Sequence, residues 1–182
     1  MKKALVILAP GFEDIEALTA VDILRRGGIE VTLAGTIDGP IKGRCGIMVL
    51  TDEAIDISLN RNYEAIILPG GAEGTENLKR DQRVADLVKR HHSEGKLIAA
   101  ICAAPTILSV LGLTKGKRLT SHPSFSKEFK EAVYSEERVV VDGNMVTSRG
   151  PGTAMEFAFK ILELLLGPGK VAEVNKGVLA KL

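Results

Sequence analysis

The stretch Lys96-Leu97-Ile98-Ala99-Ala100-Ile101-Cys102-Ala103-Ala104-Pro105 contains an apolar run that ends abruptly at a cysteine. Residues 97–101 have the composition of a strand, and Pro105 suits the first turn of a helix, where a missing N–H costs nothing. We therefore expect a strand-to-helix corner that carries the Cys102 thiol. The free amides at the helix start would face this thiol and favour its thiolate form. The alternative is a small, buried apolar cysteine.

The composition indicates an ordinary globular protein. The chain has 182 residues, of which 45% are hydrophobic and 26% are charged, and its formal net charge is +1. This length predicts one domain over residues 1–182 with a core that needs no disulfides. The near-zero net charge gives no electrostatic footprint for nucleic acid, so we expect small molecules or proteins as partners.

The amino-terminal apolar run, residues 4–9, is too short for a signal peptide and stops at Pro10-Gly11, so it is interpreted as a first strand. No segment approaches the roughly 18 apolar residues that a membrane span needs. Two cysteines without a secretory context do not indicate a disulfide framework. The sequence therefore predicts a cytoplasmic protein that does not associate with membranes.

Short apolar runs alternate with amphipathic segments, which is typical of a mainly parallel sheet covered by helices on both faces. Residues 14–26 have helical spacing of apolar residues and end at Gly27-Gly28. Residues 138–147 predict a hairpin that turns at Asp142-Gly143. Strands are expected at 3–8, 30–34, 47–50, 65–68 and 97–101, and further helices at 81–94, 106–113 and 153–166. The pattern predicts a single three-layer α/β domain.

Ligands of open α/β sheets bind beyond the carboxyl ends of the strands. The residues that follow predicted strands here are 10–16, 69–71 and Cys102, and we expect them to converge. The spacing of the first helix allows the Glu16 carboxyl to point into this crevice, although acids at a helix start also simply complement the helix dipole. Gly70-Gly71 offers unshielded amides that can stabilise an oxyanion, or forms an ordinary turn.

Other binding motifs find little support. Residues 70–74 lack the Gly-x-Gly-x-x-Gly spacing, and Gly95-Lys96 leads into a strand, so neither dinucleotide nor P-loop binding is indicated. His91 and His92 are expected to be solvated on different faces of a charged helix, and no metal site is predicted. His122 follows Cys102 by about twenty residues, and this spacing does not decide whether it reaches the thiol.

Five motifs occur in order along nearly the whole chain. They are Pro-Gly-Phe-Glu-Asp-Ile-Glu (10–16), Leu-Pro-Gly-Gly (68–71), Ala-Ile-Cys-Ala-Ala-Pro (100–105), Ser-His-Pro (121–123) and Thr-Ser-Arg-Gly-Pro-Gly-Thr (147–153). Together they resemble the ThiJ/PfpI superfamily, in the branch of the parkinsonism-associated protein deglycase and bacterial YajL. The resemblance implies a flavodoxin-like α/β/α sandwich with a nucleophile elbow, and a homodimer.

The resemblance also implies roles for particular residues. Cys102 would be the nucleophile, Glu16 the carboxyl that is hydrogen-bonded to its sulfur, and His122 a nearby residue of the pocket. The backbone amides of Gly71 and Ala103, beside Gly70, would form the oxyanion hole.

The chain departs from related patterns in three places. Ala103 follows the cysteine where the protease-like branch has His, so a compact proteolytic triad is not supplied. The late His-x-Glu of class I amidotransferases is missing as well. Cys45 stands where branch members often have Arg, and Arg44 is the neighbouring cation.

The expected function is that of a cofactor-free cysteine enzyme. The resemblance supplies its substrates, which are reactive dicarbonyls such as methylglyoxal or their early adducts with protein or nucleotide groups. The alternative is an oxidative-stress sensor or chaperone-like protein that uses oxidation of Cys102. An intracellular cysteine protease or amidase is a weaker alternative.

Overall fold

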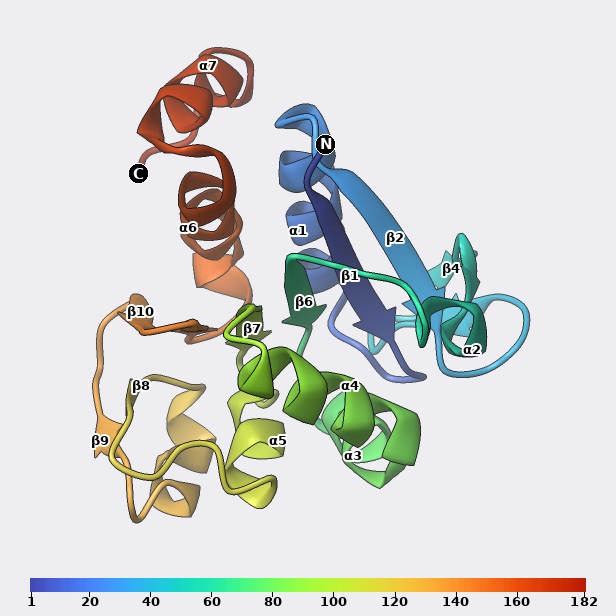
Figure 1. Ribbon diagram of the computed structural model, residues 1–182, viewed down its shortest axis with the longest axis vertical. Coiled ribbons are helices and arrows are strands. Elements are labelled where there is room, and N and C mark those ends of the chain that lie inside the picture. Colours follow the sequence, from blue (N-terminus) through green and yellow to red (C-terminus); the bar gives the residue numbers. More distant parts are fainter.

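Seven strands form the central sheet of the computed structural model, which describes residues Met1–Leu182 (Figure 1). The strand order is β10-β11-β7-β6-β1-β2-β5, and only β10 runs antiparallel to its neighbour. The strands are β1 (Lys3–Leu8), β2 (Glu30–Gly35), β5 (Glu53–Ala54), β6 (Ala65–Leu68), β7 (Leu97–Ile101), β10 (Val139–Asp142) and β11 (Met145–Ser148).

The central strands are apolar along their length because both of their faces are covered. Residues 4–8 of β1 and all four residues of β6 are buried completely. Side chains that point to one face join one core cluster, whereas those that point to the other face join a second cluster. A continuous apolar run therefore serves two cores at once.

Helices cover the two faces in separate groups (Figure 1). One core cluster contains residues of α1 (Asp14–Arg26), α6 (Ala154–Leu166) and α7 (Pro168–Val178). The other contains residues of α3 (Ala72–Arg80), α4 (Gln82–Ser93) and α5 (Pro105–Val110), with Ile55 of the short α2 (Ile55–Ser58). This arrangement confirms the expected three-layer α/β/α fold. No helix has the combination of length and apolar character that crossing a bilayer requires.

Smaller elements lie outside the main sheet. Two short ribbons are formed by β3 (Ile41–Lys42) with β4 (Met48–Val49), and by β8 (Arg118–Leu119) with β9 (Val133–Tyr134). Two 3₁₀ turns are also present: Pro123–Glu128 lies between β8 and β9, and Pro151–Thr153 leads into α6. The β3–β4 ribbon packs beside the start of α1, where the Gly11 N–H donates to the Lys42 carbonyl at 2.8 Å.

The sequence predicted several elements incorrectly. Residues 47–50 are not a strand of the main sheet, because they form one arm of the β3–β4 ribbon, and the edge of the sheet is β5 instead. The helices α3 and α7 were not expected. The helix predicted over 106–113 ends at Val110, just before Gly112 adopts a φ of 75°.

His91 is fully buried, so the expectation that it is solvated was wrong. It continues the buried face of α4, where Val84, Leu87 and Val88 precede it at helical spacing. Its Nδ1 lies 3.1 Å from the Leu87 carbonyl, and burial lowers the pKa of its imidazole. The side chain is therefore part of the packing beneath the sheet.

The order of the strands creates a crevice at their carboxyl ends. The chain passes from β1 outwards to β2 and β5, and then returns to β6 on the other side of β1. Loops that follow β1 and β6 consequently leave the sheet in opposite directions, which is the situation in which open α/β sheets bind ligands. The end of β7, at Cys102, lies beside β6.

Candidate active site

Cys102 occupies a sharp corner between β7 and α5. Its φ is 66°, a left-handed conformation that costs a non-glycine residue roughly 1–2 kcal/mol. Two hydrogen bonds hold the corner: the Cys102 N–H donates to the Ser148 carbonyl at 2.9 Å, and its carbonyl accepts from the His122 N–H at 2.8 Å. The thiol is thus fixed by backbone contacts with two distant segments.

Backbone amides surround the sulfur. The backbone N–H groups of Gly71 and Ala103 lie close to the Cys102 sulfur and lower the pKa of the thiol. Gly70 must lack a side chain, because a Cβ there would lie 2.7 Å from the Cys102 Cβ and 2.8 Å from Glu16 Oε2. The structure therefore brings the expected oxyanion-hole residues and the thiol together.

Glu16 lies in the first turn of α1 and is completely buried. Its Oε2 accepts a hydrogen bond from the Gly70 N–H at 2.8 Å, whereas its Oε1 is buried without an N–H or O–H donor. Burial raises the pKa of Glu16 to about 8, although the hydrogen bonds with Gly70 and with the Cys102 thiol lower it. The carboxyl is therefore mostly protonated at neutral pH, and a protonated oxygen can donate towards the sulfur.

The expectation that the helix amides leave Cys102 with a lowered pKa was wrong. The thiol is only 8% exposed, so burial raises its pKa, and the neighbouring Glu16 raises it further. The amides of Gly71 and Ala103 act in the opposite direction but do not overcome this effect. Because Glu16 and Cys102 interact directly, they titrate as a pair.

The other two acids at the start of α1 are also buried. An acid that only complements the helix dipole could remain exposed, so their burial indicates a further role. Glu13 and Asp14 are each 4% exposed. Glu13 caps α1, and its Oε2 accepts the Glu16 N–H at 2.9 Å. An acid three residues before Glu16, just ahead of the predicted helix, is only a weak sequence signal for this contact.

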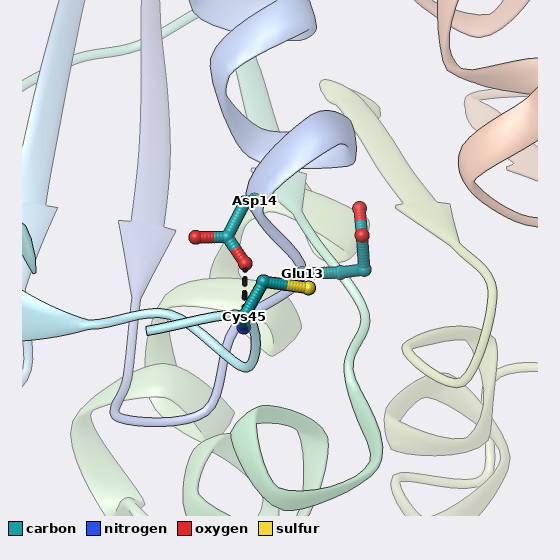
Figure 2. Close-up of side chains that lie close together, drawn as sticks. All are labelled: Glu13, Asp14 and Cys45. Atoms are coloured by element: carbon teal, nitrogen blue, oxygen red, sulfur yellow. Dashed lines mark hydrogen bonds between the residues drawn. The ribbon is translucent and has the colours of Figure 1, made fainter. Parts of the chain in front are cut away.

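Asp14 anchors the β3–β4 ribbon, a role that sequence reasoning missed. Its Oδ2 accepts the Cys45 N–H at 3.0 Å, and ligand atoms of Glu13, Asp14 and Cys45 lie within 4.8 Å of one another (Figure 2). These residues are the group best placed to hold a cation. However, Asp14 Oδ1 faces Gly43, where an added Cβ would be only 2.1 Å away. One oxygen of Asp14 thus fastens the ribbon, whereas Oδ1 is buried without a hydrogen-bond partner.

His122 reaches the corner through its backbone. Its imidazole Nδ1 accepts the Ser124 N–H at 3.3 Å, and its ring meets the Phe125 ring edge-on at a centroid distance of 6.3 Å. The imidazole forms no hydrogen bond with Cys102. Arg44 is exposed on the β3–β4 ribbon without an ion pair, and its charge lowers the pKa of Glu16.

The fold and the corner cysteine define a class of α/β proteins in which a strand ends at a thiol that faces backbone amides and a buried carboxyl. Comparison with known sequences identifies the family of the chain. Residues 2–164 match the DJ-1/PfpI family, and the chain belongs to that family. The resemblance found in the five motifs is thereby confirmed.

Individual relatives cover almost the whole chain. The chain is 46% identical to Protein dj-1beta of Drosophila melanogaster over 181 residues, covering 98% of this chain and 97% of the relative. It is 38% identical to glutathione-independent glyoxalase DJR-1.2 of Caenorhabditis elegans, with coverage of 96% and 95%.

Solved structures agree with these sequence matches. The crystal structure of Drosophila DJ-1beta has a TM-score of 0.97 and 45% identity, with coverage of 100% of this chain and 99% of that one. Oxidized DJ-1 of Toxoplasma gondii has a TM-score of 0.97 and 35% identity, with full coverage of both chains. The flavodoxin-like fold is shared along the full length.

The difference in Tm between Glu16→Gln and wild type is expected to depend on pH. The gain in Tm from the substitution should be roughly 5 °C larger at pH 8 than at pH 4.5. The pKa of Glu16 rises from 4.5 to about 8 on folding, so its stabilising contribution is complete below pH 4.5 and is lost as the pH rises through 8. Thermal unfolding at both pH values measures this difference. Asp22→Asn, which removes an exposed acid from the same helix, should give no such pH-dependent gain. Equal Tm differences at both pH values would contradict the raised pKa.

Proposed function

We propose that this protein is a cofactor-independent cysteine enzyme that converts small reactive dicarbonyls, such as methylglyoxal, into hydroxyacids. The observation that supports this proposal most strongly is the Cys102 thiol, held at a strained corner between two backbone amides and a buried, protonated Glu16. The glyoxalase activity in the name of the Caenorhabditis elegans relative is consistent with it.

The first step is addition of the thiol to the aldehyde. The Cys102 sulfur bonds to the aldehyde carbon while the Glu16 carboxyl gives its proton to the aldehyde oxygen. The thiol proton passes to the other oxygen of Glu16, so the carboxyl ends the step protonated. A raised pKa suits this two-way transfer, because the acid starts from its neutral form. The product is a hemithioacetal, and the amides of Gly71 and Ala103 can stabilise charge that develops on its oxygen.

The second step moves hydrogen between adjacent carbons. Glu16 accepts the proton from the hemithioacetal carbon and donates one to the neighbouring ketone oxygen, which gives an enediol. The same relay then protonates the neighbouring carbon and leaves a thioester on Cys102. Water cleaves the thioester and releases lactate and the thiol. One carbon is oxidised and its neighbour is reduced, so the conversion needs no external redox partner.

The limited access to the thiol favours small substrates. Cys102 is 8% exposed, and a free dicarbonyl can reach it more easily than a glycated side chain on a folded protein. Early adducts with nucleotides or proteins are therefore secondary candidates. A reducing compartment such as the cytoplasm would keep the thiol in the form that this chemistry needs.

A redox sensor is the second candidate function, because the fold is shared with a structure described as oxidized DJ-1. Two equivalents of hydrogen peroxide would convert the Cys102 thiol to a sulfinic acid and release two waters. The amides of Gly71 and Ala103 would then stabilise the oxygen anion. In such a sensor the dicarbonyl would not be turned over.

We further propose that the protein acts as a homodimer, as the family resemblance implies. Exposed apolar side chains occur on α1 and on the β3–β4 ribbon, namely Ile15, Leu18, Ile47, Met48 and Leu50. The hydrogen bond between Asp14 and Cys45 holds these two elements together. A second copy of the chain would cover the apolar side chains.

Cys102→Ser is expected to abolish lactate formation from methylglyoxal, because the alcohol is a far weaker nucleophile than the thiol. Cys45→Ser should retain wild-type activity, since Cys45 donates its backbone N–H to Asp14 and its side chain is exposed. An enzymatic lactate assay on the purified variants measures both effects. Activity that survives in Cys102→Ser but is lost in Cys45→Ser would place the nucleophile elsewhere.

Glu16→Gln is expected to lower methylglyoxal turnover by roughly a hundredfold or more, because the amide cannot exchange protons. Reaction of Cys102 with iodoacetamide should persist in this variant, which shows that the thiol is still accessible. Asp22→Asn is the matched control on α1 and should turn over normally. If Glu16→Gln retained full turnover, the carboxyl would have no role as a proton relay.

The double variant Ile15→Glu, Met48→Glu is expected to be a monomer, because it would bury two charges within the proposed interface. Analytical ultracentrifugation at micromolar concentration measures the mass. Val133→Glu changes an exposed apolar residue of β9 and should leave the dimer intact. A wild-type protein that sediments as a monomer would contradict the dimer.

A further inference from the structure

Glu13 closes a ring of three hydrogen bonds at the base of the site. Its backbone N–H donates to the Gly70 carbonyl at 3.0 Å. The Gly70 N–H donates to Glu16 Oε2 at 2.8 Å, and Glu13 Oε2 accepts the Glu16 N–H at 2.9 Å. The ring ties the start of α1 to the loop after β6, so the position of the Glu16 carboxyl depends on Glu13.

The cap by itself does not explain a glutamate at this position. Ser, Thr, Asp and Asn are the preferred caps of helices, and Ser would accept the same N–H without burying a charge. Glu13 is 4% exposed, and burying a carboxylate costs free energy unless its charge is compensated. The hydrogen bond to the Glu16 N–H therefore does not account for the negative charge of Glu13, and that charge calls for a separate explanation.

Besides the Gly70 N–H, three side chains from different elements act on the Glu16 carboxyl through charge or hydrogen bonding. The negative charge of Glu13, at the start of α1, disfavours ionisation of Glu16. Arg44 on the β3–β4 ribbon and the Cys102 thiol at the corner act in the opposite direction. Among these side chains, only Glu13 both fixes the Glu16 backbone and favours the protonated carboxyl.

We propose that Glu13 is a positioning residue for the Glu16 relay: its carboxylate holds the Glu16 backbone in place and its charge keeps the proton on the Glu16 carboxyl. The catalytic consequence rests on the proposed function, because the proton is the one that Glu16 passes to the substrate. The effect of Glu13 on the protonation of Glu16 does not depend on the proposed function. It is argued from the ring of hydrogen bonds, which holds the two acids next to each other, and from the burial of both acids. Glu13 does not touch the sulfur and acts only through Glu16.

Three variants separate the charge of Glu13 from its cap. Glu13→Asp keeps both the charge and the cap, Glu13→Ser keeps only the cap, and Glu13→Gln keeps nearly the same shape without the charge. Titration of proteins carrying ¹³C-labelled glutamate carboxyls, followed by NMR, reports the pKa of Glu16 directly. The Glu16→Gln protein assigns its signal, and Asp22→Asn on α1 is the control for loss of a distant charge.

The expected result is that Glu16 titrates roughly one unit lower in Glu13→Ser and Glu13→Gln, and as in wild type in Glu13→Asp and Asp22→Asn. The alkaline limb of kcat/KM for methylglyoxal should move to lower pH in the same two variants. If Glu13→Ser titrated as wild type, Glu13 would be only a helix cap and the proposal would be overturned. If the titrations shifted as expected in a protein that forms no lactate, the electrostatic role would stand and the proposed activity would fail.

Discussion

A buried hydrogen bond between the Gly70 N–H and the Glu16 carboxyl is the contact on which the rest of the site depends. It joins the first turn of α1 to the loop that follows β6, and the Cys102 corner closes over both. Gly70 has no room for a side chain because the Cys102 Cβ and the Glu16 carboxyl lie against it. The three segments meet only because the strand order reverses between β1 and β6.

Burial of Glu16 and Cys102 also determines which of the two side chains carry a proton. Transferring a carboxyl and a thiol into a nearly closed crevice raises both of their pKa values, and the nearby amides offset part of the increase for Cys102. The resulting pair starts neutral. A neutral acid that can give and take a proton matches a substrate whose carbonyl oxygen must gain a proton as the sulfur attacks. The site thus favours proton relays over a permanently ionised nucleophile.

Much of the fold could be predicted from the sequence because apolar runs and helical spacing are local signals. The strands β1, β6 and β7, the helix α1 and the hairpin of β10 and β11 were found in this way. The strand predicted over 47–50 was misplaced because an apolar run indicates a contact but not the partner, and here Ile47, Met48 and Leu50 lie exposed on a ribbon. The predicted lowering of the Cys102 pKa was also wrong. The helix amides near the thiol can be inferred from sequence, whereas the burial that raises its pKa depends on distant segments of the chain.

The corner of Cys102 is fastened from later parts of the chain, through the carbonyl of Ser148 and the N–H of His122. During synthesis, residue 102 leaves the ribosome well before either partner. The strained backbone at Cys102 therefore lacks the hydrogen bond to Ser148, one of its two backbone contacts, until β11 has been made and added to the sheet. A nascent chain consequently carries an ordinary thiol, and the reactive geometry is assembled only when nearly the whole polypeptide has emerged.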